Sequence, residues 1–232
     1  MSETAYNARR DQLETYFDRT AAEAWLRLTT DAPVSRIRQT VRAGRESMRA
    51  QLQSWLPADL VGRRILDAGC GTGAFSMELA RRGADVVAVD VAGSLVDVAQ
   101  ERTPSELACR IDYVVGDMLS PELGPFDHVV AMDSLIHYEP EQISTALAEL
   151  AQRTKQSIVF TYAPATPALR IMHAAGRAFP RSDRAPAIVP ISPPRLRREI
   201  NSHPCLAGWK FARDGRIKAG FYISHGQELS CE

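Results

Sequence analysis

Three glycines and a group of acidic residues have the types and spacing in this sequence that are most suited to chemistry. The run over residues 65–73 reads Ile-Leu-Asp-Ala-Gly-Cys-Gly-Thr-Gly and contains Asp67, Gly69, Gly71 and Gly73. Glycine has no Cβ atom, so such a turn can adopt positive φ angles and a ligand can lie directly against the main chain. A helical pattern opens at Ala74, and the first turn of that helix would point its free N–H groups at the ligand. The run therefore predicts a strand, a tight turn and a helix that together bind a ligand.

Two more acidic residues follow the next two expected strands. The strand over residues 84–90 ends at Asp90, where an acidic residue of a nucleotide-binding fold hydrogen-bonds ribose hydroxyls. The strand over residues 111–115 runs into Asp117 and Met118. The glycines match G-x-G-x-G, whereas the dinucleotide fingerprint has its third glycine one residue later. The glycine turn alone is therefore weak evidence, and the order and spacing of the three motifs carry the prediction.

These three motifs resemble those of the class I S-adenosylmethionine-dependent methyltransferases. In that family the first glycine loop holds the methionine part of the cofactor, the acid ending the second strand binds the ribose, and the acid after the third strand binds the adenine. The resemblance implies a set of cofactor-binding residues, namely Asp67, Gly69, Gly71, Gly73, Asp90, Val91, Asp117, Met118 and Asp133. It also implies S-adenosylmethionine as methyl donor and an α/β fold, a three-layer Rossmann-like sheet that is mostly parallel and closes with a C-terminal antiparallel hairpin. The alternative is a nucleotide-type fold with no methyl donor.

Length and composition fit one α/β domain with additions. The 232 residues are enough to bury a large core. No stretch is apolar for long enough to cross a membrane, and the polar residues 1–10 lack the apolar region of a signal peptide, so we expect a cytoplasmic protein. The four cysteines are scattered without a C-x-x-C pair, which predicts neither a zinc site nor a disulfide framework.

Charge is unevenly distributed although the formal net charge is zero. Acidic side chains outnumber basic ones over residues 51–152, and basic ones outnumber acidic ones over residues 153–218. A basic surface beside a site suits an anionic substrate, an acidic partner or a membrane surface. A solvated, arginine-rich surface without a binding role is the alternative.

The turn after the expected fourth strand contains the candidate reactive side chains. A buried strand over residues 126–132 is followed by the turn Asp133-Ser134-Leu135-Ile136-His137-Tyr138 and then by a helix over residues 140–153. Ligands of open α/β sheets sit beyond the carboxyl ends of the strands, so this turn should face the transferred group. His137 is therefore a candidate site residue, with a structural hydrogen-bonding role as the alternative, and Tyr138 is a weaker candidate.

Elements outside the core should build the substrate side. An amphipathic helix is expected from about Val34 to Pro57, and one of its faces carries Arg38, Arg42, Arg45 and Arg49. This face is either solvated or a stripe that binds carboxylates or a partner. On a shorter helix before it, an aromatic and apolar set either joins the core or caps a flat apolar substrate: Tyr16, Phe17, Trp25 and Leu28.

After a fifth strand over residues 157–162, a stretch rich in Pro, Ala and Arg runs from 163 to 192 and contains a helical pattern at 169–179. An insertion at this point lies over the rim of the site and acts as a lid. A helix from 193 to 200 and strands at about 208–213 and 217–224 close the fold, with Asp214-Gly215 as the hairpin turn. Four segments result, namely an N-terminal helical arm and substrate cap at 1–57, a cofactor-binding core at 58–162, the lid at 163–192, and the closing helix and hairpin at 193–232.

Several stretches outside the generic core resemble the magnesium-protoporphyrin IX methyltransferase family. The matching stretches are Tyr16-Phe17 with Trp25 and Arg27, Ile37-Arg38 with Gly44, Leu56-Pro57, Asp133 to Tyr138, and Tyr162-Ala163-Pro164 with Thr166-Pro167. That family methylates one propionate carboxylate of magnesium protoporphyrin IX, giving a monomethyl ester in chlorophyll and bacteriochlorophyll biosynthesis for photosynthesis. Its oxygenic members often carry a tyrosine shortly after the position of Arg27, where this chain has Leu28, Thr29 and Thr30. A role of that tyrosine therefore does not transfer.

This resemblance implies roles for individual residues and for partners. His137, with Tyr138 as the weaker candidate, would donate a hydrogen bond to the propionate or contact the macrocycle. Tyr16, Phe17 and Trp25 would stack on the porphyrin, and Arg38 and Arg42 would pair with its second propionate. Magnesium would belong to the substrate, with no protein-bound metal. The substrate would be handed over by the porphyrin-carrying subunit of magnesium chelatase. No nucleic-acid partner is implied, and contact with a photosynthetic membrane would be peripheral at most.

The substrate's chemistry distinguishes the remaining alternatives. A propionic acid has a pKa of about 4.3, so the nucleophile is already ionised at neutral pH and no general base is required. Methylation of a phenol or quinol, whose pKa is about 10, would need a base, and His137 could supply it. A non-catalytic tetrapyrrole carrier is a third possibility, and it predicts a damaged glycine loop or a missing ribose acid. Both motifs are intact here.

Overall fold

One mixed sheet forms the centre of the protein. The structure is a computed structural model that describes residues 3–18, 36–165 and 188–231. Seven strands lie in the order β3-β2-β1-β4-β5-β7-β6. Their bounds are β1 Arg64–Ala68, β2 Asp85–Asp90, β3 Ile111–Val115, β4 Phe126–Ala131, β5 Thr154–Tyr162, β6 Trp209–Ala219 and β7 Tyr222–Cys231. Strands β1 to β5 are parallel, and β7 is antiparallel to both β5 and β6, which confirms the expected sheet.

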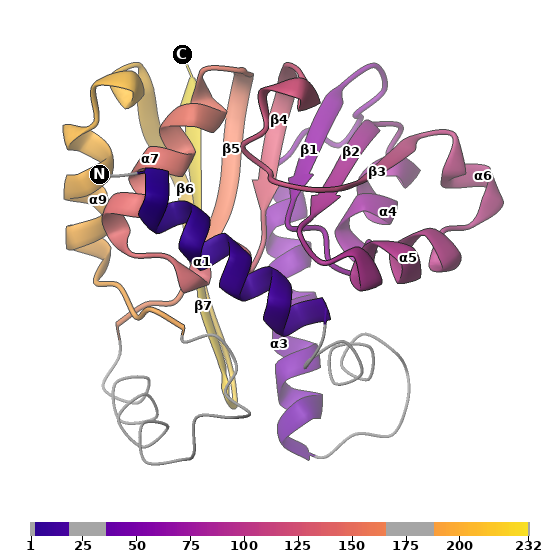
Figure 1. Cartoon of the computed structure of the whole chain (residues 1–232), viewed down its shortest axis with the longest axis horizontal. Helices are drawn as coiled ribbons and strands as arrows, with labels where there is room; N and C mark the ends of the chain where they lie inside the picture. Colours follow the sequence, from indigo (N-terminus) through magenta and orange to yellow (C-terminus); the bar gives the residue numbers. More distant parts are fainter. Residues whose placement is uncertain (1–2, 19–35, 166–187, 232) are drawn as a thin grey trace.

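Helices cover both faces of this sheet (Figure 1). The α-helices are α1 Glu3–Tyr16, α3 Arg36–Ser54, α4 Ala74–Arg81, α5 Gly93–Arg102, α6 Ser105–Ala108, α7 Pro140–Ala151 and α9 Pro193–Ser202. Short 3-10 helices are η2 Pro121–Leu123, η3 Leu135–His137 and η5 Pro204–Leu206. Figure 1 shows α1 and α7 in front of the sheet and α3 and α4 behind it.

Two hydrophobic clusters separate these layers. Val129 of β4 packs in a cluster with Leu147 of α7, and the next residue, Val130, packs in the other cluster with Met48 of α3 and Leu79 of α4. Successive side chains of a strand point to opposite faces, so β4 is apolar on both sides and is covered on both sides. The expected three-layer α/β fold is confirmed.

The strand register brings the acidic motifs to one edge. Asp67 pairs with Ala88 across β1 and β2, and Asp90 pairs with Val115 across β2 and β3. Because the strands are parallel, their carboxyl ends lie at the same edge. The residues that follow those ends are therefore neighbours in space.

The closing hairpin turns later than the sequence analysis predicts. Strand β6 continues through Asp214-Gly215, and the chain reverses at Gly220-Phe221 between the paired residues Ala219 and Tyr222. Gly220 has a φ of 57°, which a two-residue hairpin turn requires. The expected turn at Asp214-Gly215 is wrong because both residues pair with β7, Asp214 with Gln227 and Gly215 with Gly226, and Gly215 also packs against α3. A Cβ atom on Gly215 would lie 2.4 Å from the Gln51 Nε2 atom of α3.

Further glycines bring α3 close to this hairpin. A Cβ atom on Gly44 of α3 would lie 2.5 Å from Cδ1 of Tyr222. On the hairpin side, a Cβ atom on Gly220 would lie 2.5 Å from Oγ1 of Thr40, and one on Gly226 would lie 2.9 Å from Cδ2 of Leu52. Contacts below 3.0 Å are too short for a real Cβ atom, so these positions accept no larger residue without movement.

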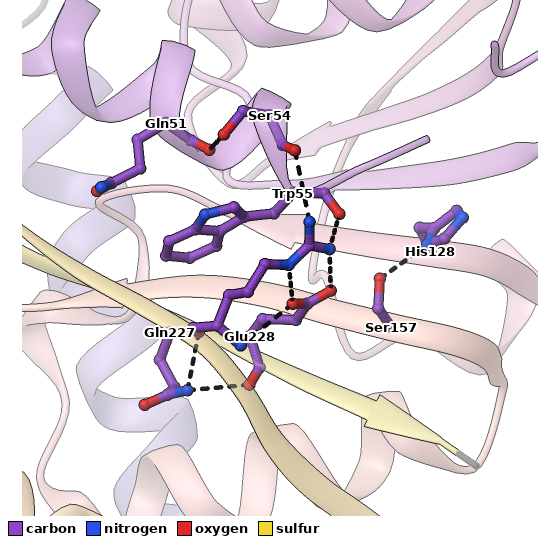
Figure 2. A network of polar contacts seen from close by, with 8 residues as sticks. Gln51, Ser54, Trp55, His128, Ser157, Gln227 and Glu228 are labelled. Carbon is purple, nitrogen blue, oxygen red and sulfur yellow. Dashed lines mark hydrogen bonds and ion pairs between the residues drawn. The ribbon is translucent and has the colours of Figure 1, made fainter. Parts of the chain in front are cut away.

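An ion pair fastens the end of α3 to the same hairpin (Figure 2). Arg213 of β6 holds both carboxylate oxygens of the buried Glu228 of β7, with Nε–Oε2 at 2.6 Å and Nη2–Oε1 at 2.8 Å. The same guanidinium donates to the carbonyl oxygens of Ser54 and Trp55 at the C-terminal end of α3. A helix ends with carbonyls that lack partners within the helix, and Arg213 satisfies two of them here.

Some sequence predictions fall outside the described residues, and the bounds of one helix were not predicted. Trp25, Leu28 and the helical pattern at 169–179 lie in ranges that the structure does not describe. Helix α1 lies within the helical arm expected at 1–57, but the sequence analysis did not assign a helix to residues 3–16 in particular. No helix within the described ranges is long and apolar enough to span a membrane.

Gly44→Ala tests the close packing of α3. Alanine gains about 1 kcal/mol of helix propensity over glycine, but the new methyl group would collide with Cβ and Cγ of Tyr222, each 2.8 Å away. Overpacking of this kind costs about 1–3 kcal/mol, so we expect a lower free energy of unfolding in urea titrations. Gly208→Ala is the control, because a Cβ atom there meets nothing within 4 Å. An unchanged or higher midpoint for Gly44→Ala would contradict the packing argument.

Candidate active site

A cavity of about 580 Å³ opens at the carboxyl edge of the parallel strands. Its lining comes from the turn after β1, the ends of β2, β3 and β4, and helices α1 and α3. Eight of the nine predicted cofactor residues line it, namely Asp67, Gly69, Gly71, Asp90, Val91, Asp117, Met118 and Asp133. The ninth, Gly73, is not in the lining, although its neighbours Thr72 and Ala74 are.

The glycine turn has the left-handed backbone that its sequence predicts. Gly69, Gly71 and Gly73 have φ angles of 82°, 54° and 75°. A Cβ atom on Gly69 would lie 2.5 Å from the Ser134 Cβ atom, and one on Gly73 would lie 2.5 Å from the Tyr113 hydroxyl oxygen. Gly73 also caps the start of α4. Glycine is therefore required here for backbone conformation and for space.

Asp90 is fixed by the main chain at the end of β2. Its Oδ2 atom accepts a hydrogen bond from the amide of Gly71 at 2.8 Å, and its Oδ1 atom accepts one from the amide of Ala92 at 3.0 Å. Burial raises the pKa of this carboxyl group, and these two amides oppose the rise by stabilising the ionised form. The carboxylate is thus a fixed hydrogen-bond acceptor facing the cavity.

Asp67 is almost completely buried beneath the turn, with 1% of its surface exposed. The hydroxyl of Ser76 in α4 donates to its Oδ2 atom at 2.6 Å. Burial raises the pKa of Asp67 to about 7, while the Ser76 hydrogen bond and the charge of Arg49 oppose the rise. The charge on this side chain therefore changes close to neutral pH.

Asp117 is held by α1, whose bounds the sequence analysis did not predict. The hydroxyl of Tyr6 donates to its Oδ1 atom at 2.8 Å, and Nη1 of Arg10 donates to its Oδ2 atom at 3.0 Å. The amide of Leu119 also donates to Oδ1, at 2.9 Å. The signal that could have found this helix is the spacing of three and four residues between Tyr6, Arg10, Leu13 and Phe17.

Asp133 joins four elements at the end of β4. It is the single non-glycine residue with positive φ in the described part of the chain, at 58°. The Tyr222 hydroxyl of β7 donates to its Oδ1 atom at 3.0 Å, and Arg45 of α3 pairs with its Oδ2 atom at 3.1 Å. Its own amide donates to Oγ1 of Thr161 in β5, at 2.7 Å. Such a strained backbone persists where several contacts hold it, as they do here.

His137 and Tyr138 both line the cavity, as predicted, and both are buried. His137 meets the ring of Phe17 edge-on, with 6.2 Å between ring centroids. Tyr138 stacks on Tyr6, with 5.3 Å between centroids and 19° between planes. Burial raises the pKa of Tyr138, so its hydroxyl stays protonated. Tyr6 of α1 and Phe17 just after this helix therefore fix the turn that carries His137.

Of the four predicted substrate residues that the structure describes, three line the cavity and one does not. Tyr16, Phe17 and Arg42 line the cavity, whereas Arg38 lies on an exposed part of α3 outside the lining. Arg45 and Arg49, which were not assigned to the substrate, do line it. Sequence reasoning also missed Phe221 at the hairpin turn and Ile188, which line the cavity with 51% and 41% of their surfaces exposed.

Two residues of the lining, Ser134 and Ser224, have a buried hydroxyl without a hydrogen-bond partner among the described residues. The hydroxyl of Ser134 is buried against the glycine turn. Buried hydroxyls are normally bonded, so this one is suited to a polar ligand group. In the same described ranges, no group of three or more His, Cys, Asp or Glu side chains is arranged to hold a metal ion.

The comparisons with known proteins cover nearly the whole chain. A family model described as the C-terminus of magnesium-protoporphyrin IX methyltransferase matches residues 131–230, and a general methyltransferase-domain model matches residues 65–157. A magnesium-protoporphyrin O-methyltransferase from Rhodobacter capsulatus is 51% identical over 93% of both chains. One from Synechocystis sp. is 29% identical over 90% of both chains.

A solved structure agrees with these sequence matches. The crystal structure of magnesium protoporphyrin IX methyltransferase from Synechocystis PCC 6803 with bound SAH has a TM-score of 0.84. It is 27% identical to this chain, and the alignment covers 97% of this chain and 100% of that chain. The matches to relatives and to this structure extend over almost the full length of the chain and so reach beyond residues 65–157, which the general methyltransferase-domain model matches. The chain belongs to the magnesium-protoporphyrin O-methyltransferase family.

Proposed function

We propose that this protein transfers a methyl group from S-adenosylmethionine to one propionate carboxylate of magnesium protoporphyrin IX. The observation that carries the proposal is the separation of charge in the cavity. Carboxylates lie at the strand ends, and a row of guanidinium groups lies on α3, namely Arg42, Arg45 and Arg49. An acidic end suits a cationic methyl donor, and a basic wall suits an anionic acceptor.

The residues present fit the methyl donor. Positive φ at the glycine turn exposes the main chain, Asp90 offers a fixed acceptor for ribose hydroxyls, and the Ser134 hydroxyl offers an unused polar group. Asp117 and Met118 would hold the adenine. When bound, S-adenosylmethionine supplies a methyl group activated by a positively charged sulfur.

The chain's own contribution is then binding and orientation. The acceptor carboxylate is ionised well below neutral pH, so no side chain has to remove a proton. The enzyme has to hold the carboxylate oxygen in line with the methyl group and remove water from it, and both effects lower the barrier. In this proposal His137 donates a hydrogen bond to the acceptor carboxylate or contacts the macrocycle.

The remaining residues of the cavity hold the large flat substrate. Tyr16 and Phe17 present aromatic rings for stacking, and Arg42 is the predicted partner of the second propionate. Because Arg45 and Arg49 also line the cavity, we add them to the basic wall. Asp133 pairs with Arg45 and accepts a hydrogen bond from Tyr222. In this proposal it therefore orients the basic wall in addition to its predicted contact with the cofactor.

Two interactions remain proposals that rest on charge. The exposed arginines of α9, among them Arg195 and Arg197, would dock the porphyrin-carrying subunit of magnesium chelatase. The same basic surface would support a peripheral, reversible membrane contact at most.

Asp90→Ala tests the cofactor site. With methyl-labelled S-adenosylmethionine and magnesium protoporphyrin IX, the wild-type protein should add a single labelled methyl group to the porphyrin, detected by mass spectrometry. Loss of the fixed acceptor at Asp90 should reduce cofactor binding and methylation by about a hundredfold or more. Asp112→Ala, an exposed acid on β3, is the matched control and should retain activity. Methylation by Asp90→Ala at the wild-type rate would remove Asp90 from the site.

The pH profile distinguishes a carboxylate acceptor from a phenol. At saturating substrate and cofactor, kcat should be flat from about pH 6 to 8, since the acceptor is already ionised. Cofactor affinity should instead rise with pH through about 7, because Asp67 is protonated below its pKa and ionised above it, and a cationic ligand favours the ionised form.

His137→Ala provides the companion measurement. A positioning role predicts a fall in kcat of about tenfold to a hundredfold with the profile still flat. If kcat instead followed a group that titrates near neutral pH and that dependence disappeared in His137→Ala, a general base would be at work. The acceptor would then be a phenol or quinol, and the carboxylate proposal would be wrong.

A further inference from the structure

Helix α1 reaches the cavity at one particular acidic residue. Tyr6 and Arg10 lie one helical turn apart, so their side chains project from the same face, and both bind the carboxylate of Asp117. Neither residue belongs to the glycine turn or to the strand ends that define the general cofactor-binding core.

The two oxygens of Asp117 are not equally occupied. A carboxylate oxygen has two lone-pair directions. Oδ1 accepts from the Tyr6 hydroxyl at 2.8 Å and from the Leu119 amide at 2.9 Å, so both of its directions are used. Oδ2 accepts from Arg10 at 3.0 Å and retains one direction, and Asp117 lines the cavity.

We propose that Tyr6 is a positioning residue for nucleobase recognition. By occupying Oδ1 together with Leu119, it fixes the rotation of the Asp117 carboxylate and presents Oδ2 to an amino group of the ligand, such as the exocyclic amine of adenine. The inference rests on the proposed function, because it requires an adenosyl cofactor in this cavity.

The surroundings of Tyr6 keep it in this role. Its ring stacks on Tyr138, which restrains the direction of its hydroxyl. Burial, together with the negative charge of Asp117, raises the pKa of the Tyr6 phenol, so the hydroxyl remains a donor across the working pH range. Just beyond α1, Asp18 accepts hydrogen bonds from the amide and hydroxyl of Ser94 at the start of α5, which fastens the other end of the helix.

The alternative is that Tyr6 only fastens α1 to the sheet. A fastening role would change stability and would weaken every ligand of the cavity to a similar degree. A positioning role changes the preference between two ligands that differ only in the group that Asp117 reads. The ratio of two affinities therefore separates the two roles, whereas activity alone does not.

The experiment measures binding of S-adenosylhomocysteine and of S-inosylhomocysteine by isothermal titration calorimetry. The inosine analogue carries a carbonyl oxygen in place of the exocyclic amine, so it cannot donate to Oδ2. The wild-type protein should prefer the adenosyl ligand by about tenfold to a hundredfold, the effect expected for one hydrogen bond to a charged group. Tyr6→Phe keeps the ring and removes the hydroxyl, and it should reduce this preference by about fivefold or more.

Two further variants show whether the effect passes through Asp117. Asp117→Asn should lose most of the preference, and adding Tyr6→Phe to it should change the preference no further. Arg9→Gln is the control. Arg9 is a residue of α1 with the same charge as Arg10, but its side chain donates to Gln12 on the exposed side of the helix and not to Asp117. This variant should keep the wild-type preference.

The possible results distinguish a failure of the inference about Tyr6 from a failure of the proposed function. If Tyr6→Phe binds both ligands with an unchanged ratio, or if the wild-type protein shows no preference, the inference about Tyr6 is overturned and the cofactor assignment stands. If the wild-type protein binds neither ligand, the proposed function fails together with the inference. A preference that falls in Tyr6→Phe while thermal unfolding is unchanged supports the positioning role.

Discussion

The close contact between α3 and the β6–β7 hairpin fixes one wall of the cavity. Glycine occurs on both sides of that contact, at Gly44 in the helix and at Gly226 in the hairpin, and neither position has space for a Cβ atom. Successive helical residues are about 100° apart, so the residue after Gly44 points away from the contact and toward the cavity. That residue is Arg45, and its 3.1 Å pairing with Asp133 requires the helix to lie this close.

The carboxylates of the cavity are tolerated together because each has its own donors. Four acids at one sheet edge would repel one another and would resist burial. Asp67 is bound by a hydroxyl of α4, Asp90 by two main-chain amides, Asp117 by α1, and Asp133 by α3 and β7. The donors are neutral at the first two acids and include an arginine at the other two. Net negative charge is therefore concentrated around Asp90, and around Asp67 as well above its pKa of about 7, so a cationic group is best accommodated there.

The parts of this structure that depend on local sequence were predictable, and those that depend on contacts between distant segments were not. Positive φ at Gly69 and the ends of β1 to β3 follow from neighbouring residue types, and the structure confirms them. Asp214-Gly215 has a strong local preference for a turn, yet the pairing of β6 with β7 continues through both residues and the chain reverses at Gly220. Likewise, helical periodicity placed four arginines on one face of α3, but it could not show that the cavity begins beyond Arg38.

The chemistry of the proposed methyl acceptor explains why the core and the helices before it have different roles. A carboxylate that is already ionised needs alignment and not proton transfer, so catalytic power depends on how rigidly the two ligands are held. The strand ends within residues 65–157, the range that the methyltransferase-domain model matches, supply the carboxylate acceptors of the cavity. Helices α1 and α3 precede that range and supply the residues that orient those acceptors and form the basic wall. We therefore propose that specificity for a large dianionic substrate resides mainly in the elements that precede the first strand of the core.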